Sequence, residues 1–294
     1  MASYVVTGVN RGIGFEFLRQ LSENPNSIVI GLSRNKKATE EKVKAEIGRS
    51  NIHILEADAS DAAALKQAAA DTSKITGGKI DYVIANAAVA SEWSEYGNVE
   101  SLGQEPERFE KDILDTIKIN TIGPIHLFTF FLPLLRNGSA KKAIAISTGM
   151  ADAEMISKFA VAISPPYAIS KGALNIAVAK FDAQYRKEGI LFLAISPGLV
   201  DTGKGATREY SPSTFEVLFS IKIRCTNKNT VVTEEQKKGL GAMIAQFSEY
   251  APNWAGPITP EVSVKAVLKV IDESSIENGS GGAFISHWGN KQWL

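Results

Sequence analysis

A tyrosine and a lysine one helical turn apart could move a proton in this sequence. Tyr167-Ala168-Ile169-Ser170-Lys171 follows two prolines, which are common at the first positions of a helix. Residues i and i+4 of a helix lie on one face, so the phenol and the ammonium are neighbours. A nearby ammonium lowers the pKa of a phenol from its usual value of about 10. The spacing predicts a tyrosine that exchanges a proton at neutral pH, the alternative being an exposed Tyr–Lys pair.

Three glycines near the start of the sequence could bind a phosphate. Residues 7–14 read Thr-Gly-Val-Asn-Arg-Gly-Ile-Gly, between an apolar stretch and a helix-like one. Glycine lets the backbone approach a pyrophosphate closely, and the free N–H groups of a helix N-terminus attract the anion. An ordinary strand-to-helix turn is the alternative. The position after a first strand favours a dinucleotide site that contains Gly8, Asn10, Arg11, Gly12, Ile13 and Gly14.

The end of the second candidate strand, at Ser33 and Arg34, indicates which dinucleotide is bound. An acidic residue at this place binds the ribose 2′-hydroxyl, whereas a basic residue accommodates a 2′-phosphate. The sequence has no Asp or Glu between Ile28 and Thr39. Arg34 and Arg11 could hold a 2′-phosphate together, because guanidinium groups match phosphate geometry. The sequence predicts NADP(H) rather than NAD(H), unless both arginines are simply solvated.

Alternating strands and helices must position these residues. Short β-branched stretches alternate with longer amphipathic ones, which is typical of βαβ units and a parallel sheet. Right-handed crossovers then place helices on both faces. We expect strands at residues 4–7, 27–32, 52–56, 80–85, 143–147, 191–196 and 283–288, and helices at 13–23, 38–47, 62–75, 106–135 (as two helices), 167–187, 234–250 and 260–272.

The predicted fold class is therefore α/β. We expect a single-domain Rossmann fold over residues 1–294, with a doubly wound, mostly parallel sheet of about seven strands flanked by helices on both faces. Residues 198–260 are too long for a simple connection and predict a lid or pocket wall. Apolar residues of the variable stretches suggest a pocket for an aromatic or polycyclic ketone, or merely pack the lid: Met150, Met155, Phe159, Phe215, Leu218, Phe219 and Trp254.

Composition excludes several classes of protein. The 294 residues include 32 Lys+Arg and 32 Asp+Glu, so net charge gives no attraction to nucleic acid or anionic lipid. Cys225 is the only cysteine, and three scattered histidines do not resemble a zinc site. The sequence does not begin like a signal peptide, and polar residues and prolines interrupt its most apolar stretch, residues 117–135. We expect a cytoplasmic protein with no metal, nucleic-acid or membrane partner.

Together these motifs resemble the short-chain dehydrogenase/reductase family, in its single-domain branch. The resemblance covers residues 3–202, and the last residues, 286–294, resemble the fungal-type reductases of that family. His287, in this last stretch, is expected to be structural. The resemblance adds three groups of cofactor-binding residues: Asp58 and Ala59 beside the adenine; Asn86, Ala87 and Ala88 lining the site; and Pro197, Gly198, Val200 and Thr202 around the nicotinamide.

By the same resemblance, Asn120, Tyr167 and Lys171 are catalytic and also touch the cofactor. The family's catalytic serine follows the fifth strand, where this sequence has Ser147-Thr148. The register favours Thr148, whose hydroxyl can donate the same hydrogen bond, with Ser147 as the alternative. The stretch from Thr148 to Tyr167 is longer than in the family's common spacing, and residues 152–164 are expected to form a loop beside the substrate.

The resemblance implies that NADPH reduces a ketone or aldehyde. Thr148 or Ser147 would bind the carbonyl oxygen, and Tyr167 would protonate it. Lys171 would lower the tyrosine pKa, and Asn120 would anchor a water in the proton relay. A homodimer or homotetramer is expected through the fourth and fifth helices. Two alternatives stay open on the same fold: a non-redox cyclase or isomerase, and an NADP-sensing binding protein.

Overall fold

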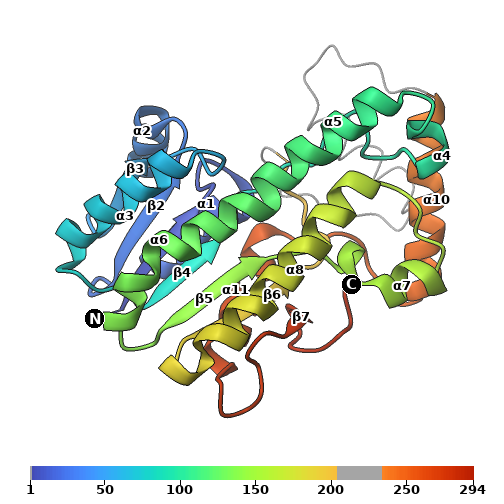
Figure 1. Ribbon diagram of the computed structural model, residues 1–294. Coiled ribbons are helices and arrows are strands. Elements are labelled where there is room, and N and C mark those ends of the chain that lie inside the picture. Colours follow the sequence, from blue (N-terminus) through green and yellow to red (C-terminus); the bar gives the residue numbers. More distant parts are fainter. Residues whose placement is uncertain (1, 204–233) are drawn as a thin grey trace.

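A seven-stranded parallel sheet lies between two layers of helices in the computed structural model, which describes residues 2–203 and 234–294 (Figure 1). The strand order is β3-β2-β1-β4-β5-β6-β7, and every neighbouring pair is parallel. The predicted α/β fold and its seven strands are confirmed. The strands are β1 (Ser3–Thr7), β2 (Ile28–Ser33), β3 (Ile52–Glu56), β4 (Tyr82–Ala85), β5 (Lys142–Ile146), β6 (Leu191–Ser196) and β7 (Phe284–Ser286).

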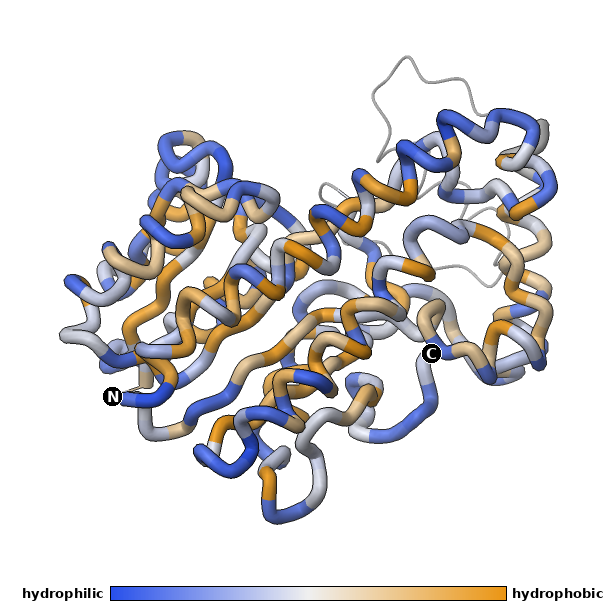
Figure 2. The backbone as a smooth tube through the Cα atoms, viewed as in Figure 1, coloured by the Kyte–Doolittle hydropathy of each residue, from blue (hydrophilic) through white to orange (hydrophobic). Residues whose placement is uncertain are grey.

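Helices cover both faces of the sheet, so successive residues of a strand pack into different layers. Val5 of β1 belongs to the core formed with α3, α6 and α8, whereas Val6 belongs to the core formed with α1 and α11. Strands buried on both faces are apolar almost throughout, and Figure 2 shows the apolar residues concentrated along the strands. These helices are α1 (Gly12–Leu21), α3 (Ala62–Thr76), α6 (Gly123–Asn137), α8 (Pro165–Tyr185) and α11 (Pro260–Glu273), and α2 (Lys36–Glu46) covers the β3 edge.

The strand order reverses between β1 and β4. The chain runs from β1 to β2 and β3 on one side, then returns across β1 to add β4, β5, β6 and β7 on the other. In an open parallel sheet this reversal leaves a crevice at the carboxyl ends of the two central strands, where ligands bind. Thr7 ends β1, and Asn86 follows β4, so both predicted cofactor motifs reach this crevice.

Residues 106–135, which we expected to form two helices, belong to one continuous rod. It consists of α5 (Pro106–Ile117), a π-helical turn η1 (Lys118–Ile122) and α6. The extra residue of a π turn is absorbed without breaking the helix, and such turns are frequent at functional sites. By length and composition alone the helix Pro106–Asn137 could cross a membrane, with a mean hydropathy of 1.2, but half of its most apolar stretch is buried inside the fold.

Residues 152–164, which we expected to form a loop, contain the short helix α7 (Ala153–Lys158). Asp152 begins this helix, because its Oδ1 accepts from the backbone amides of Glu154 (2.9 Å) and Met155 (3.3 Å). α7 packs with α10 (Glu234–Tyr250) and with Trp293 in a third apolar cluster, separate from the two layers around the sheet. In the expected lid, Phe215, Leu218 and Phe219 lie outside the described residues.

Candidate active site

Glycines close the turn between β1 and α1 so tightly that side chains cannot fit. Gly8 and Gly12 have φ angles of 72° and 55°, in the left-handed region that favours glycine. A Cβ on Gly14 would lie 2.2 Å from the carbonyl oxygen of Gly8, and a Cβ on Gly8 would lie 2.8 Å from the Cα of Ala87. α1 begins at Gly12, so the free amides of its first turn face the same crevice. Arg11 precedes the helix and is exposed, as is Asn10, whereas Ile13 packs on the apolar layer beneath.

Asn86 joins β4 to this turn. Its Nδ2 donates to the carbonyl oxygens of Thr7 (2.9 Å) and Gly8 (3.4 Å). In return, Thr7 Oγ1 accepts from the backbone amides of Asn86 (3.0 Å) and Ala87 (2.9 Å), and Ala88 follows on the surface. The two motifs that the sequence predicted for the cofactor are therefore held together by four hydrogen bonds to main-chain atoms.

Four predicted residues lie beyond the carboxyl ends of β2 and β3. Ser33 is buried and shares a hydrogen bond with Thr39 (2.8 Å), whereas Arg34 is exposed. Burial alone would raise the pKa of the Asp58 carboxyl, but hydrogen bonds from Ser60 and the charges of Arg34 and Lys118 hold it below its usual value. The carbonyl oxygen of Ala59 faces the start of α6, where a Cβ on Gly123 would lie 2.3 Å away.

Asn120 lies at the centre of the π turn and is fully buried. Its Oδ1 accepts from the Val89 amide (2.8 Å), and its Nδ2 donates to the Val89 carbonyl (2.8 Å) and to Ser170 Oγ (3.0 Å). Ser170 Oγ in turn donates to the Tyr167 carbonyl (2.8 Å). Both hydrogens of the amide are thus engaged by protein atoms, and only Oδ1 keeps capacity to accept from a water.

Tyr167 and Lys171 lie one turn apart near the start of α8, as the sequence predicted. Tyr167 is half-buried, and Lys171 is buried with its Nζ donating to the carbonyl oxygen of Ile146 (2.6 Å) in β5. Ser164, directly before α8, has a φ of 54°, and its amide donates to the Gly97 carbonyl (3.0 Å). The catalytic helix is therefore fixed both at its start and along the face that meets β5.

The lowering of the Tyr167 pKa by Lys171 stays a prediction, because the causes that act on this phenol among the described residues run in the opposite direction. Burial raises the pKa of Tyr167 to about 12, and the Glu95 carboxylate raises it further. Burial also lowers the pKa of Lys171 to about 7. Both shifts come from desolvation, which disfavours the charged form of each group.

The two candidate hydroxyls after β5 have different surroundings. Ser147 is buried, and its Oγ donates to Oδ1 of Asn175 (2.7 Å) on α8. Thr148 is half-buried, and its Oγ1 accepts from the Met150 amide (3.3 Å), which leaves the hydroxyl hydrogen available within the described residues. Because the Ser147 hydrogen is already committed to Asn175, the geometry favours Thr148 as the donor to a substrate.

The segment after β6 extends to the glycine turn. The Pro197 carbonyl accepts from Ser263 Oγ (2.7 Å), and Gly198 has a φ of 82°. Val200 forms a parallel bridge with Ile258, and the Thr202 side chain would lie 3.1 Å from a Cβ on Gly12. The predicted nicotinamide-facing residues therefore border the same crevice as Gly8 and Asn86.

His287 lies behind this segment and is buried. A Cβ on Gly198 would lie 2.8 Å from its Cε1, so the ring supports the turn at Gly198. Burial lowers the pKa of His287 to about 4, so the ring is neutral at pH 7. These contacts agree with the structural role expected for this histidine.

Three residues that fix the site were missed from the sequence: Ser170, Asn175 and Val89. Ser170 and Asn175 lie on the same helix as Tyr167, and Asn175 is four residues after Lys171. Helical periodicity around the Tyr–Lys pair could have found both. Val89 takes part only through its main chain, which leaves no signature in a sequence.

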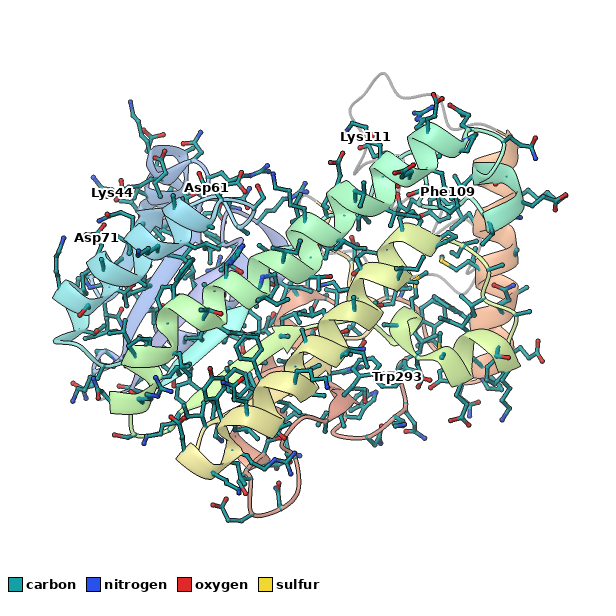
Figure 3. All side chains as sticks on the ribbon, viewed as in Figure 1. Lys44, Asp61, Asp71, Phe109, Lys111 and Trp293 are labelled. Atoms are coloured by element: carbon teal, nitrogen blue, oxygen red, sulfur yellow. The ribbon has the colours of Figure 1, made fainter. Side chains whose placement is uncertain are left out.

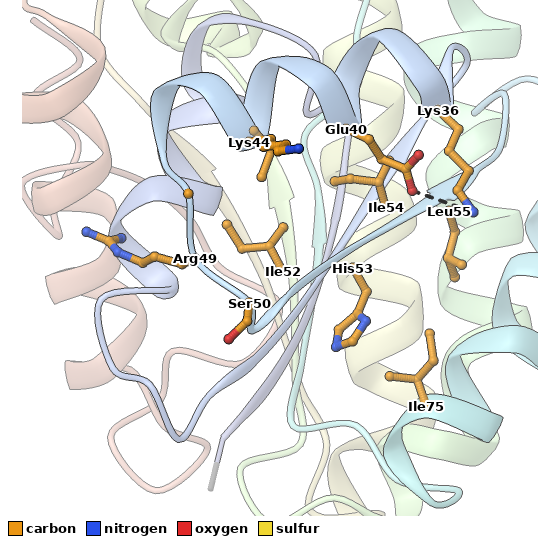
Figure 4. A pocket seen from close by; sticks show the side chains of 12 residues that line it. Lys36, Glu40, Lys44, Arg49, Ser50, Ile52, His53, Ile54, Leu55 and Ile75 are labelled. Carbon is orange, nitrogen blue, oxygen red and sulfur yellow. Dashed lines mark ion pairs between the residues drawn. The ribbon is translucent and has the colours of Figure 1, made fainter.

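Two surface cavities lie outside the crevice. One, of about 550 Å³, opens between α2, β3 and the end of α3, at the outer edge of the sheet, and is lined by Lys36, Lys44, His53 and Ile75 among others (Figure 4). A smaller one, of about 410 Å³, lies between Ser60, Val89 and the end of α5. Among the described residues no cluster of His, Cys, Asp or Glu could hold a metal ion. The converging motifs, rather than either of these cavities, mark the candidate site.

Comparison with known proteins identifies the family of the chain. The family profile for short chain dehydrogenases matches residues 3–211. The short chain dehydrogenase virK of Hypocrea virens is 48% identical over 295 residues, and the match covers 100% of both chains. The short-chain dehydrogenase/reductase iacC of Pestalotiopsis fici is 42% identical over 296 residues, also with full coverage of both.

Among solved structures, an NADPH-bound carbonyl reductase from chicken fatty liver superposes with a TM-score of 0.71 at 25% identity, covering 99% of this chain and 98% of that one. The similarity thus extends beyond the strands and helices of the dinucleotide fold to the last third of the chain. With the glycine turn, Asn86, Asn120 and the Tyr–Lys helix assembled at one crevice, the chain belongs to the short-chain dehydrogenase/reductase family of oxidoreductases.

Proposed function

We propose that this protein uses NADPH to reduce a ketone or aldehyde to an alcohol. The observation that carries the proposal is the attachment of α8 to β5 and η1. Lys171 bonds the Ile146 carbonyl, and Asn120 bonds Ser170 beneath Tyr167. These bonds bring an acid, a hydroxyl donor and a buried amine to the end of β5. The likeness to a carbonyl reductase described as NADPH-bound supports the same chemistry.

The crevice fits a dinucleotide. The glycine turn is closed too tightly for side chains, so its backbone stays bare, and the free amides of α1 suit a pyrophosphate. Arg34 and Arg11 are both exposed at this end of the crevice and suit a 2′-phosphate. Asp58 and Asn86 border the positions of the adenine and the rest of the cofactor. When bound, NADPH would supply the hydride.

Thr148 and Tyr167 would handle the substrate oxygen. The Thr148 hydroxyl donates to the carbonyl oxygen, because its oxygen accepts from the Met150 amide while its hydrogen has no protein acceptor among the described residues. With a pKa of about 12, the Tyr167 phenol is protonated at neutral pH and can give its proton to the developing alkoxide. Lys171, with a pKa of about 7, can return a proton to the phenolate.

The test is NADPH consumption at 340 nm on a panel of ketones, quinones and aldehydes. Tyr167→Phe is expected to lower kcat by about 10³-fold while NADPH affinity changes less than about twofold, because only the acid is lost. Tyr185→Phe, at the far end of the same helix, is the matched control and should leave kcat unchanged. Near-normal turnover in Tyr167→Phe contradicts the proposed acid.

The alternatives give different results in the same assay. Substrate that is converted without NADPH consumption supports a non-redox cyclase or isomerase. NADPH binding without conversion of any compound supports a sensing role. Met150, Met155, Phe159 and Trp254 pack in the third apolar cluster, and Met150 also follows Thr148 closely in the sequence, so apolar or aromatic ketones should be tried first.

We also propose that the protein is a homodimer or homotetramer. Leu114 (59%), Ile122 (41%), Ile169 (48%) and Ile176 (64%) are exposed on α5, η1 and α8, which pack side by side. Apolar side chains exposed on adjacent helices are typical of a protein–protein contact. Light scattering should give two or four times the chain mass of 31.6 kDa. Ile176→Glu should shift the population toward the single chain, and a wild-type mass of one chain contradicts the proposal.

A further inference from the structure

The short turn that follows Thr148 is held by a hydrogen bond on every amide. This turn, η2 (Gly149–Ala151), begins at Thr148 and ends at Asp152. The Gly149 amide donates to Ser196 Oγ (3.1 Å) of β6, and the Met150 amide donates to Thr148 Oγ1 (3.3 Å). The Ala151 amide donates to the Thr148 carbonyl (3.0 Å), and the Asp152 amide to the Gly149 carbonyl (2.9 Å). The orientation of the Thr148 hydroxyl therefore depends on the geometry of this turn.

One indole, that of Trp293, contacts both ends of the turn. At the start, a Cβ on Gly149 would lie 2.4 Å from Cβ and 2.6 Å from Cγ of Trp293, so the backbone and the tryptophan are in close contact. At the end, Nε1 of Trp293 donates to Oδ2 of Asp152 (3.0 Å). The other carboxylate oxygen of Asp152 caps α7, so the same aspartate joins the turn, the helix and the indole.

Trp293 is itself held in place from two further elements. Its ring stacks on Phe284 of β7, with centroids 4.4 Å apart and planes 15° from parallel. Its amide donates to the hydroxyl of Tyr250 (3.0 Å), which donates to the Lys291 carbonyl (3.1 Å). Trp293 is only 3% exposed. Figure 3 shows it among the side chains between α8 and α7. Trp293 is thus held by contacts with β7 and α10 and packs between them and the turn.

We propose that Trp293 is a positioning residue for the reaction: its contacts with Gly149 and Asp152 fix the turn that aims the Thr148 hydroxyl at the substrate carbonyl. The inference rests on the proposed function, which assigns that hydroxyl to the carbonyl oxygen. Small displacements of a catalytic group can cost large factors in rate, so a residue without substrate contact can control kcat.

Four variants test the contact between Trp293 and Asp152. Trp293→Phe keeps the aromatic ring on Phe284 but removes the N–H donor. Asp152→Ser keeps a good helix cap for α7 but removes the acceptor. The double variant combines both changes, and Gln292→Ala, at the exposed neighbouring position, is the control.

Each variant is measured in two ways. Hydrogen–deuterium exchange of the amides of residues 149–152 reports the turn directly and needs no substrate. We expect exchange to be about 10-fold faster in Trp293→Phe and in Asp152→Ser, and the double variant to add little to either. On a carbonyl substrate, kcat should fall about 10-fold, while KM for NADPH stays within about twofold, because the cofactor contacts are untouched.

The outcomes separate this inference from the proposed function. Exchange that stays at the wild-type rate in both single variants, or faster exchange with unchanged kcat, overturns the positioning role. If the wild type reduces no carbonyl, the proposed function fails, and the exchange data still decide whether Trp293 fixes the turn. Effects that simply add in the double variant show that Trp293 does not act through Asp152, and they overturn the inference as stated.

Discussion

At the cofactor side of the crevice, the close contacts are made to main-chain atoms, whereas at the substrate side they depend on particular large side chains. Gly14 lies against the Gly8 carbonyl, Gly8 lies against Ala87, and Asn86 bonds main-chain oxygens. Around η2, by contrast, the Trp293 indole, the Asp152 carboxylate and the Tyr250 hydroxyl make the contacts. Both regions join segments far apart in the sequence, but the first consists of residues in recognisable motifs, whereas Trp293 and Tyr250 of the second belong to no motif.

The difference explains why the glycine turn has a sequence signature and the surroundings of η2 have none. Close backbone approach requires glycine at fixed positions, so the requirement is visible as a motif. A side chain that supports a turn can come from any segment that the fold brings near, so neither its position in the sequence nor its residue type is fixed in advance. We therefore expect the cofactor side to tolerate almost no change at its glycines, and the substrate side to tolerate graded changes.

The largest expected effect is a loss of NADPH affinity when the glycine turn is disrupted. Gly14→Ala places a methyl group 2.2 Å from the Gly8 oxygen and 2.6 Å from Asn86 Nδ2, so the turn must open. NADPH affinity, measured by fluorescence titration, should fall more than about 100-fold. Gly172→Ala on α8 is the control, since nothing lies within 4 Å of its added methyl, and should stabilise by up to about 1 kcal/mol. Wild-type affinity in Gly14→Ala contradicts the close packing of the turn.

The next effect separates the two hydroxyls of the substrate side. Thr148→Val keeps the shape but removes the donor, and kcat should fall about 100-fold with NADPH affinity unchanged. Ser147→Ala breaks only the bond to Asn175, so the free energy of unfolding should fall by about 1–2 kcal/mol, with kcat reduced less than about 10-fold. Steady-state kinetics and urea unfolding measure both. The reverse order of the two kcat losses assigns the catalytic hydroxyl to Ser147.

A smaller effect tests the phosphate end of the crevice. Arg34→Gln removes one exposed guanidinium and should reduce the preference for NADPH over NADH by about 10-fold or more, while NADH affinity stays nearly constant. Binding of both dinucleotides is measured in parallel. Arg49→Gln, in the connection from α2 to β3 and away from the crevice, is the matched control. A wild type that binds both dinucleotides equally well removes the basis for NADP(H) selectivity.

The smallest effect concerns the buried lysine. Burial lowers the pKa of Lys171 from 10.5 to about 7 in the folded protein. Between these two values the unfolded chain carries a proton on this lysine that the folded protein does not. The free energy of unfolding therefore rises with pH across this window. Below about pH 7 the folded protein also carries the proton, so the whole destabilisation by the buried charge is present. The thermal midpoint of the wild type, relative to Lys171→Met, should therefore rise between about pH 7 and pH 9.5, on the order of 5 °C.

Lys180→Met, at an exposed position of the same helix, is the control and should show no such trend. A difference between the wild type and Lys171→Met that stays constant with pH means that the ammonium remains fully charged in the folded protein. In that case Lys171 could lower the pKa of Tyr167, as the sequence predicted.

Much of the fold was predictable because the strands and the helices that cover them each leave a periodic pattern of apolar residues in the sequence. All seven strands and the helices that cover them were expected within a few residues, since buried strands are β-branched and their helices amphipathic. The continuous helix from α5 through η1 to α6 was not predicted from the sequence. Asn120, in the π turn, bonds the main chain of Val89, and this contact between distant segments leaves no local propensity to read. α7 was missed for a similar reason, since it is a short helix stabilised by Asp152 and by packing with α10.

The sequence by itself determined the α/β fold, the glycine turn and the Tyr–Lys helix, because each depends on local spacing that few other sequences satisfy. Only the tertiary structure decided the state of the reacting groups. The bond from Ser147 to Asn175 leaves Thr148 as the free donor, and burial sets the pKa values of Tyr167 and Lys171. The position of Trp293 against the turn that follows Thr148 was likewise decided only by the tertiary structure. Hydrogen-bond partners and desolvation depend on which distant segments meet, and that information exists only once the chain has folded.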